Sequence, residues 1–201
     1  MEDPEARKEL GGLIVISIAT LAIIAVIITA GIMLFSSNFT FDYRAIDIAF
    51  PAYEEQQLSA TRMDIIRTVE HEYYNPRNAL EYSDGIDEPW CADFVSWIYN
   101  TAGHKFKNPV SSGWRIPGVY TLKDYFVEEK RWHDKDSGSI PEPGDVIIYG
   151  GGIFGNHTNI VISVYYDEII TVGGNENGKI MMHRIDYNDN RYGILGYGSA
   201  E

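Results

Sequence analysis

Three residues of this chain have the types, and the order, that a thiol hydrolase requires. Cys91 is the only cysteine among the 201 residues, and it is followed along the chain by His157 and Asn175. A thiolate can attack a carbonyl carbon, an imidazole can accept the thiol proton, and a carboxamide can hold the imidazole in one orientation. The three residues therefore predict a nucleophile, a general base and an orienting residue, provided that the fold brings them together.

Cys91 lies in the first turn of a predicted helix. Apolar residues recur at the positions i+3, i+4 and i+7 from Cys91, Pro89 suits a first turn, and Gly103 suits a helix end, so a helix is expected over residues 90–102. Unpaired N–H groups at a helix N-terminus favour a thiolate, and the backbone N–H of Cys91 is the expected donor to an oxyanion. The alternative is an inert cysteine buried on the apolar stripe of the helix.

His157 is the expected general base among the five histidines. It follows a glycine-rich segment and precedes the apolar run 160–162, so it is expected where a strand begins, firmly held but open to a cleft. The other four are interpreted as surface or filler residues: His71, His104, His133 and His183.

Asn175 is the expected orienting residue because of where the next strand ends. A strand over residues 158–166 is expected to pair antiparallel with a strand over 168–172, which would bring Asn175 close to His157. The amide oxygen of Asn175 would accept the Nδ1–H of the ring, leaving Nε2 for the thiol. The alternative is that Asn175 is only a turn residue.

Helical and strand periods occupy different parts of the chain. Three helices are predicted, over residues 61–74, 90–102 and 118–130. Five short β-type runs follow, over residues 145–149, 158–166, 168–172, 180–185 and 192–198. Helices followed by antiparallel strands are typical of an α+β fold.

The N-terminal region differs from the rest of the chain in composition. No charged residue occurs from Leu10 to Asn38, a length sufficient to cross a bilayer core of about 30 Å. Arg7 and Lys8 precede it, which places the N-terminus in the cytoplasm and the remainder outside. The alternative is a cleaved signal peptide. The expected organisation is a cytoplasmic N-terminus (1–10), a transmembrane helix (11–35), a juxtamembrane linker (36–60) and a hydrolase domain (61–201).

The charge of the chain limits its partners. The formal net charge is −13, and no basic patch is evident that could neutralise phosphates, so nucleic acid is not an expected partner. A single cysteine cannot form an internal disulfide, so in an oxidising compartment its thiol is either buried or used in chemistry.

The segments around the three candidate residues resemble the CHAP family, the cysteine-, histidine-dependent amidohydrolases/peptidases. These are papain-like enzymes of bacterial and phage cell-wall turnover, related to the NlpC-type peptidases. The resemblance extends over about residues 61–185. It includes Val69-Glu70-His71-Glu72, Ala79-Leu80-Glu81-Tyr82, Glu88-Pro89-Trp90-Cys91-Ala92-Asp93-Phe94-Val95-Ser96-Trp97, Pro143-Gly144-Asp145-Val146-Ile147, His157-Thr158-Asn159-Ile160-Val161 and Gly173-Gly174-Asn175.

The resemblance implies a papain-like α+β domain in which N-terminal helices pack on an antiparallel sheet of about five strands. It implies that Cys91 is the nucleophile, His157 the base and Asn175 the orienting residue. The implied substrate is peptidoglycan, cleaved either at the muramoyl–L-alanine bond or within the stem or cross-bridge peptide, without a cofactor. Candidates for lining the substrate groove, on location alone, are Tyr82, Trp90 and Trp114.

The chain departs from the family pattern at three places. Gly173 stands where many members carry a glutamate, so Asn175 would orient the histidine alone. Thr158 and Asn159 replace a small aliphatic pair after the histidine. Some phage members bind calcium in the acidic loop before the cysteine; here the loop 84–88 has three carboxylates without a matching spacing, so a solvated loop is the preferred interpretation and no metal is expected.

These observations predict a single-pass membrane protein whose catalytic domain faces the cell wall, with a protein activator or secretion machinery as possible partners. The competing hypothesis is a non-catalytic CHAP-like module that binds wall peptide or a membrane or secretion partner.

Overall fold

A computed structural model of the chain describes residues 49–53 and 57–201. The expected cytoplasmic segment 1–10, the expected transmembrane helix 11–35 and most of the linker 36–60 lie outside the described residues. Within the described ranges, no helix is both long enough and apolar enough to cross a membrane.

Among the described residues, four α-helices precede all the strands: α2 (Ala60–Tyr74), α3 (Ala79–Tyr82), α4 (Cys91–Thr101) and α5 (Val119–Glu128). The three longer ones confirm the helices expected from apolar spacing, to within two residues at each end. The short helix α3 was not predicted. It forms because Asn78 and Glu81 cap each other's backbone N–H groups in a capping box, a local device that needs no apolar period.

Six antiparallel strands form one sheet in the order β1-β6-β2-β3-β4-β5. Their bounds are β1 (Trp132–Asp134), β2 (Val146–Gly151), β3 (Gly155–Tyr165), β4 (Glu168–Glu176), β5 (Lys179–Asp186) and β6 (Ile194–Gly198), with 3₁₀ turns at Lys135–Ser137 and Asn190–Tyr192. The sequence predicted five strands. The unexpected strand β1 contains His133, which was interpreted from the sequence as a surface or filler residue. The strand pairs with β6, and the ring of His133 stacks on Tyr197 at 4.8 Å.

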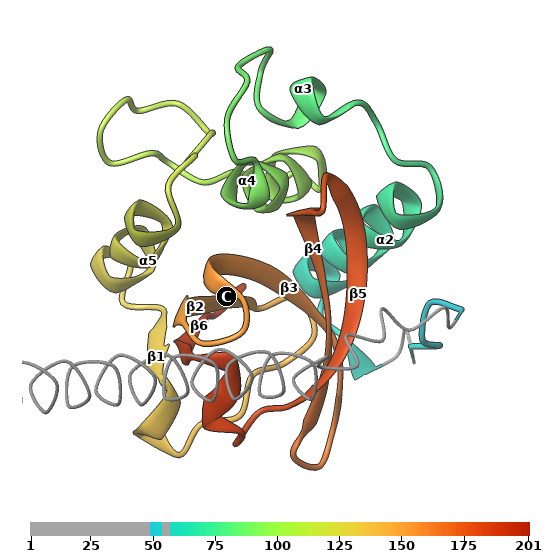
Figure 1. Ribbon diagram of the computed structural model, residues 1–201, viewed down its shortest axis with the longest axis vertical. Helices are drawn as coiled ribbons and strands as arrows, with labels where there is room; N and C mark the ends of the chain where they lie inside the picture. The colour runs from blue at the N-terminus through green and yellow to red at the C-terminus, as the bar shows by residue number, and fades with distance from the viewer. Residues whose placement is uncertain (1–48, 54–56) are drawn as a thin grey trace, which may run out of the picture. The chain divides into compact units, whose positions relative to one another are not determined.

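The helix α4 lies between α2 and α5 over the strands (Figure 1). Its side chains Phe94, Val95 and Ile98 are fully buried in one core with Ile160 of β3 and Val172 of β4. Alternate residues of the strands point to the opposite face and form a second apolar cluster there. The sheet is therefore buried on both faces, and α4 is held firmly against β3 and β4.

The start of α4 approaches the end of β4 very closely. A Cβ atom added to Gly174 would lie 2.4 Å from Trp90 Cζ3 and 2.6 Å from Phe94 Cβ. Such distances are too short for any side chain at this position, so the glycine permits the approach. The contact places the residue after Trp90, which is Cys91, near the end of β4.

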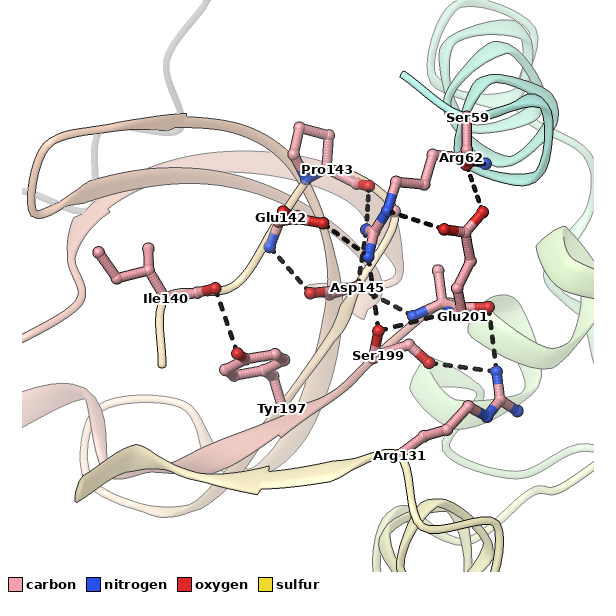
Figure 2. Close-up of polar contacts among 12 residues, drawn as sticks. Ser59, Arg62, Arg131, Ile140, Glu142, Pro143, Asp145, Tyr197, Ser199 and Glu201 are labelled. Atoms are coloured by element: carbon pink, nitrogen blue, oxygen red, sulfur yellow. Dashed lines mark hydrogen bonds and ion pairs between the residues drawn. The ribbon is translucent and has the colours of Figure 1, made fainter. Parts of the chain in front are cut away.

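The segment before β2 is tied to α2 and to the C-terminal residues by buried polar contacts (Figure 2). Arg62 Nη1 donates to Pro143 O at 2.7 Å and to Asp145 Oδ1 at 2.8 Å, and the backbone N–H of Ala200 donates to the same Asp145 oxygen at 2.9 Å. Arg131 donates to the carbonyls of Ser199 and Ala200. Asp145, in the Pro-Gly-Asp segment, is therefore a structural anchor.

Candidate active site

Cys91 is the first residue of α4 and is almost covered, with 6% of its surface exposed. Its neighbour Trp90 is the N-cap residue, and no described side chain caps this end of the helix. The amide groups of the first turn are thus available to an anion, which the helix dipole also favours. The local environment suits a thiolate and the oxyanion that forms when it attacks a carbonyl.

His157 lies on β3 opposite Tyr149 of β2, and 7% of its surface is exposed. The strand begins at Gly155, earlier than expected. The residues before and after His157 therefore both pair with β2, which fixes the backbone of the histidine. The aromatic rings of Phe154 and Tyr149 lie roughly parallel to the imidazole, at 5.8 and 6.1 Å. Cys91 is one of the groups that raise the pKa of His157, so the expected nucleophile and base lie near each other.

The third group at this site is Glu176, one residue beyond the expected Asn175. His157 Nε2 lies 3.3 Å from Glu176 Oε1. Because Nε2 faces the carboxylate, Nδ1 is the ring nitrogen left for the thiol, which reverses the assignment expected from the sequence. Asn175 itself has a left-handed backbone, with φ of 62°, and is half-buried. The structure thus corrects the expected position of the orienting group by one residue.

An irregularity in the sheet explains why Glu176 was missed. Side chains alternate along a regular strand, so neighbouring residues 175 and 176 would face opposite sides. The β4–β5 pairing shifts register between Gly173 and Glu176, and the left-handed Asn175 lies within this shift. The bulge decides which of the two polar side chains turns toward His157. The signal in the sequence that could have indicated Glu176 was the presence of a carboxylate directly after the expected asparagine.

Gly173, where relatives often carry a glutamate, leaves no room for a side chain. A Cβ atom there would lie 1.9 Å from Asn159 Oδ1 and 2.7 Å from Glu176 Oε1. The amide group of Asn159 occupies this space, with Nδ2 at 3.2 Å from Thr171 Oγ1 and at 3.4 Å from Glu176 Oε1. The departures at positions 159 and 173 are therefore connected, because the side chain of Asn159 needs the space that glycine leaves at position 173. The carboxylate beside His157 is then that of Glu176.

The charges of His157 and Glu176 stabilise each other. Burial lowers the pKa of His157, but its hydrogen bonds with Cys91 and Glu176 outweigh this and raise the pKa to about 9. Burial raises the pKa of Glu176, but hydrogen bonds with His157 and His183 outweigh it, so the pKa lies below its ordinary value. At neutral pH the site therefore holds an imidazolium paired with a carboxylate.

Two of the three aromatic residues expected to line the groove border cavities, and one does not. Tyr82 is fully buried, and its hydroxyl donates to Glu72 Oε2 at 2.8 Å, so the prediction that it lines the groove is wrong. Its ring stacks on Trp90 at 5.2 Å as part of the core. Trp90 borders a cavity of about 360 Å³ with Arg77 and Lys179. Trp114 borders another cavity of about 360 Å³.

The acidic loop before Cys91 is braced by an arginine. Arg115 Nη1 lies 2.5 Å from Glu88 Oε1 and 2.6 Å from Asp93 Oδ1. Burial raises the pKa of Asp93 to about 6, although Arg115 opposes the rise. Glu88 is therefore already ion-paired. Within the described ranges, no group of three or more histidine, cysteine, aspartate or glutamate side chains is placed to hold a metal ion.

Comparison with known proteins gives a match to one family model. Residues 82–175 match the model of the CHAP domain, which confirms the resemblance seen in the sequence. The chain is also similar to the crystal structure of Ly7917 with the hydrolyzing product of MDP (TM-score 0.46) and to the crystal structure of Ly7917 (TM-score 0.45), each at 14% identity over 69% of this chain. This chain spans 62% of the length of those structures. No match was found among curated proteins.

Proposed function

Since this chain carries a CHAP domain, we propose that it is a cysteine hydrolase that cleaves an amide bond in peptidoglycan. The observation that supports this proposal most directly is the contact of His157 with Glu176, beside a Cys91 that acts on the pKa of the same imidazole. Nucleophile, base and orienting group are the three parts of a thiol-hydrolase triad. Cys91 is the nucleophile, His157 the general acid and base, and Glu176 the residue that orients the ring.

The reaction proceeds in two halves. The proton of the Cys91 thiol resides on His157 in the reactive state, and the resulting thiolate attacks the carbonyl carbon of the amide. The backbone N–H of Cys91 stabilises the oxyanion of the tetrahedral intermediate. The C–N bond breaks, the amine leaves with the proton from His157, and a thioester to Cys91 remains. Water then loses a proton to His157, attacks the thioester, and releases the carboxylic acid and the thiol.

Glu176 contributes to both halves. The imidazolium form of His157 exists before the amide bond breaks, and a carboxylate beside Nε2 stabilises that form and keeps Nδ1 toward the thiol. The raised pKa of His157, about 9, means that the ring carries its proton at neutral pH and can give it to the leaving amine.

The substrate bond is the muramoyl–L-alanine amide or an amide of the stem or cross-bridge peptide. Trp90 is the groove residue that this proposal keeps, because it directly precedes Cys91. Trp114 is kept on its position in the sequence; the cavities that the two residues border are separate, and neither is lined by Cys91 or His157. The apolar residues 11–35 anchor the protein in a membrane with the catalytic domain facing the wall, supported by the uncharged run from Leu10 to Asn38. A protein activator or secretion machinery is a further partner consistent with that location.

Digestion of purified peptidoglycan by the full-length protein tests the function. Mass spectrometry of the products identifies the bond: free stem peptides indicate an amidase, and new termini within the peptides indicate an endopeptidase. Cys91→Ala is expected to abolish product formation while retaining the thermal unfolding midpoint, and Cys91→Ser to be nearly inactive, because a hydroxyl is a much poorer nucleophile than a thiolate. Unchanged digestion by the alanine variant would remove Cys91 from the mechanism.

A further inference from the structure

A second histidine lies on the far side of Glu176 from the catalytic pair. His183 of β5 contacts Glu176 Oε2 through its Nε2 atom, while Glu176 Oε1 faces His157. The two oxygens of one carboxylate thus each serve one imidazole. His183 is 4% exposed and Glu176 9% exposed, so neither group can exchange its partner freely for water.

The surroundings of Glu176 make this second contact consequential. A buried carboxylate is stable only when hydrogen bonds and opposite charges replace its lost hydration. Besides the two histidines, only Asn159 among the described side chains donates to it, at 3.4 Å and to the same oxygen that faces His157. Phe154 closes the group from one side, edge-on to His183 at 5.2 Å and parallel to His157 at 5.8 Å. Oε2 of Glu176 therefore depends on His183.

We propose that His183 is a positioning residue of the active site, which holds Oε2 of Glu176 so that Oε1 stays on His157. The proposal rests on the function proposed above, because it assigns His183 to the support of the same triad. It also explains how Glu176, which pairs with Lys179 directly after the register shift of β4 and β5, keeps its carboxylate on His157. The histidine interpreted from the sequence as a filler residue thus completes a chain of four groups from Cys91 to His183.

The proposal has a definite consequence for pH dependence. The ionisable groups facing Glu176 are His157 from β3 and His183 from β5, with Cys91 of α4 beyond His157 and Tyr149 of β2 stacked beside it. His183 is one of the groups that lower the pKa of Glu176. Without it, Glu176 takes up a proton at higher pH, the imidazolium loses its carboxylate, and the reactive state of Cys91 appears at higher pH.

Alkylation of the full-length protein by iodoacetamide across the pH range measures this directly, because Cys91 is the only cysteine. The rate is expected to rise with pH along an acid limb. His183→Asn and His183→Leu should move that limb upward by about one pH unit, the size typical of a lost partner at a carboxylate. His183→Gln should stay close to the native profile, because its amide nitrogen lies where Nε2 of histidine lies, whereas the asparagine amide matches Nδ1.

The matched control is Arg184→Gln, at the next residue of β5, whose exposed guanidinium lies 3.4 Å from Glu168. It should leave the acid limb in place. If His183 had only a structural role, the three His183 variants would unfold at lower temperature, and the acid limb of the alkylation rate would stay where it is in the native protein. Both His183→Asn and His183→Leu are measured, so that the proposal is tested if either variant folds. If His183→Asn or His183→Leu folds and its alkylation rate rises over the same pH range as that of the native protein, the proposal is overturned.

The alkylation assay also separates this proposal from the proposed function. If the native protein does not digest peptidoglycan but the limb shifts as expected, the substrate assignment is wrong and the support of Glu176 by His183 stands. If the native protein digests peptidoglycan and the limb does not move, the function stands and the role of His183 is refuted.

Discussion

Replacing Glu176 by glutamine removes the carboxylate while keeping nearly the same volume, and it tests the centre of the proposed mechanism. The pKa of His157 is about 9, against an ordinary value of 6.5. At about 1.4 kcal/mol per pH unit, this difference corresponds to about 3 kcal/mol of net stabilisation of the imidazolium, which Cys91 and Glu176 supply against the opposing effect of burial. A half share, about 1.5 kcal/mol, is about a tenfold change in rate.

The expected effect of Glu176→Gln on turnover exceeds that tenfold change. A glutamine amide can donate to Nε2 and so hold the ring in the wrong tautomer, as in the loss of about 10⁴-fold described for an asparagine in a serine-protease triad. We therefore expect kcat to fall by between about 10-fold and 10⁴-fold, with little change in KM. The measurement is steady-state digestion of soluble peptidoglycan fragments, with thermal unfolding to confirm the fold.

The alkaline side of the profile gives a signed test of the same variant. Loss of Glu176 removes one of the two hydrogen bonds that raise the pKa of His157, so the pKa falls from about 9 toward 6.5. The general acid is then lost at lower pH, and the alkaline limb of kcat moves downward. In the native protein, the stability that His157 contributes is fully present below about pH 6.5 and is lost as pH rises through about 9. The variant should lose it at lower pH.

Asn175→Gly is the matched control, because it removes the neighbouring polar side chain and tolerates the left-handed backbone at φ of 62°. Its loss of kcat should be much smaller than that of Glu176→Gln. Equal kcat values for native protein and Glu176→Gln, or a larger loss in Asn175→Gly, would refute the reasoning and return the orienting role to Asn175.

Three further results are expected. Gly173→Ala should lower stability by about 1–3 kcal/mol, since its Cβ would clash with Asn159, and Gly173→Glu should fail to rescue Glu176→Gln; a recovered rate would contradict the packing described. Arg62→Ala should lower the free energy of unfolding, measured by chemical denaturation, by about 3–5 kcal/mol, because it leaves Asp145 buried without its charged partner. Removing the exposed carboxylate of Glu142 should lower it by at most about 1 kcal/mol. Similar losses in the two variants would contradict the role of Asp145 as a structural anchor. A reporter enzyme fused to the C-terminus should be active outside the cytoplasm, and cytoplasmic activity would exclude both the anchored topology and the wall substrate.

Much of the active site was predictable because it depends on local patterns. The apolar spacing after Cys91 identified α4 and placed the thiol in its first turn, as the structure confirms. The turn between two β-type runs predicted their antiparallel pairing, which brings the end of β4 toward His157. Periodicity and turn residues act over a few positions, so a single sequence carries them directly.

Some side chains were misassigned because their environment depends on distant parts of the chain. Tyr82 appeared to be a groove residue from its position in the sequence, but Glu72 of α2 and the ring of Trp90 enclose it. The strand β1 exists because β6, more than sixty residues later, pairs with it. Neither environment leaves a periodic signal in the segment concerned.

The sequence by itself determined the three longer helices, five of the six described strands, the CHAP resemblance, and the choice of Cys91 and His157 as candidates. Only the tertiary structure decided that Glu176 faces the imidazole, that Asn159 occupies the space beside Gly173, and that His183 holds the second oxygen of the carboxylate. The physical reason is the bulge at the end of β4. Strand alternation assigns residues to faces only while the register is regular, and a shift of one residue exchanges the side chain that turns inward.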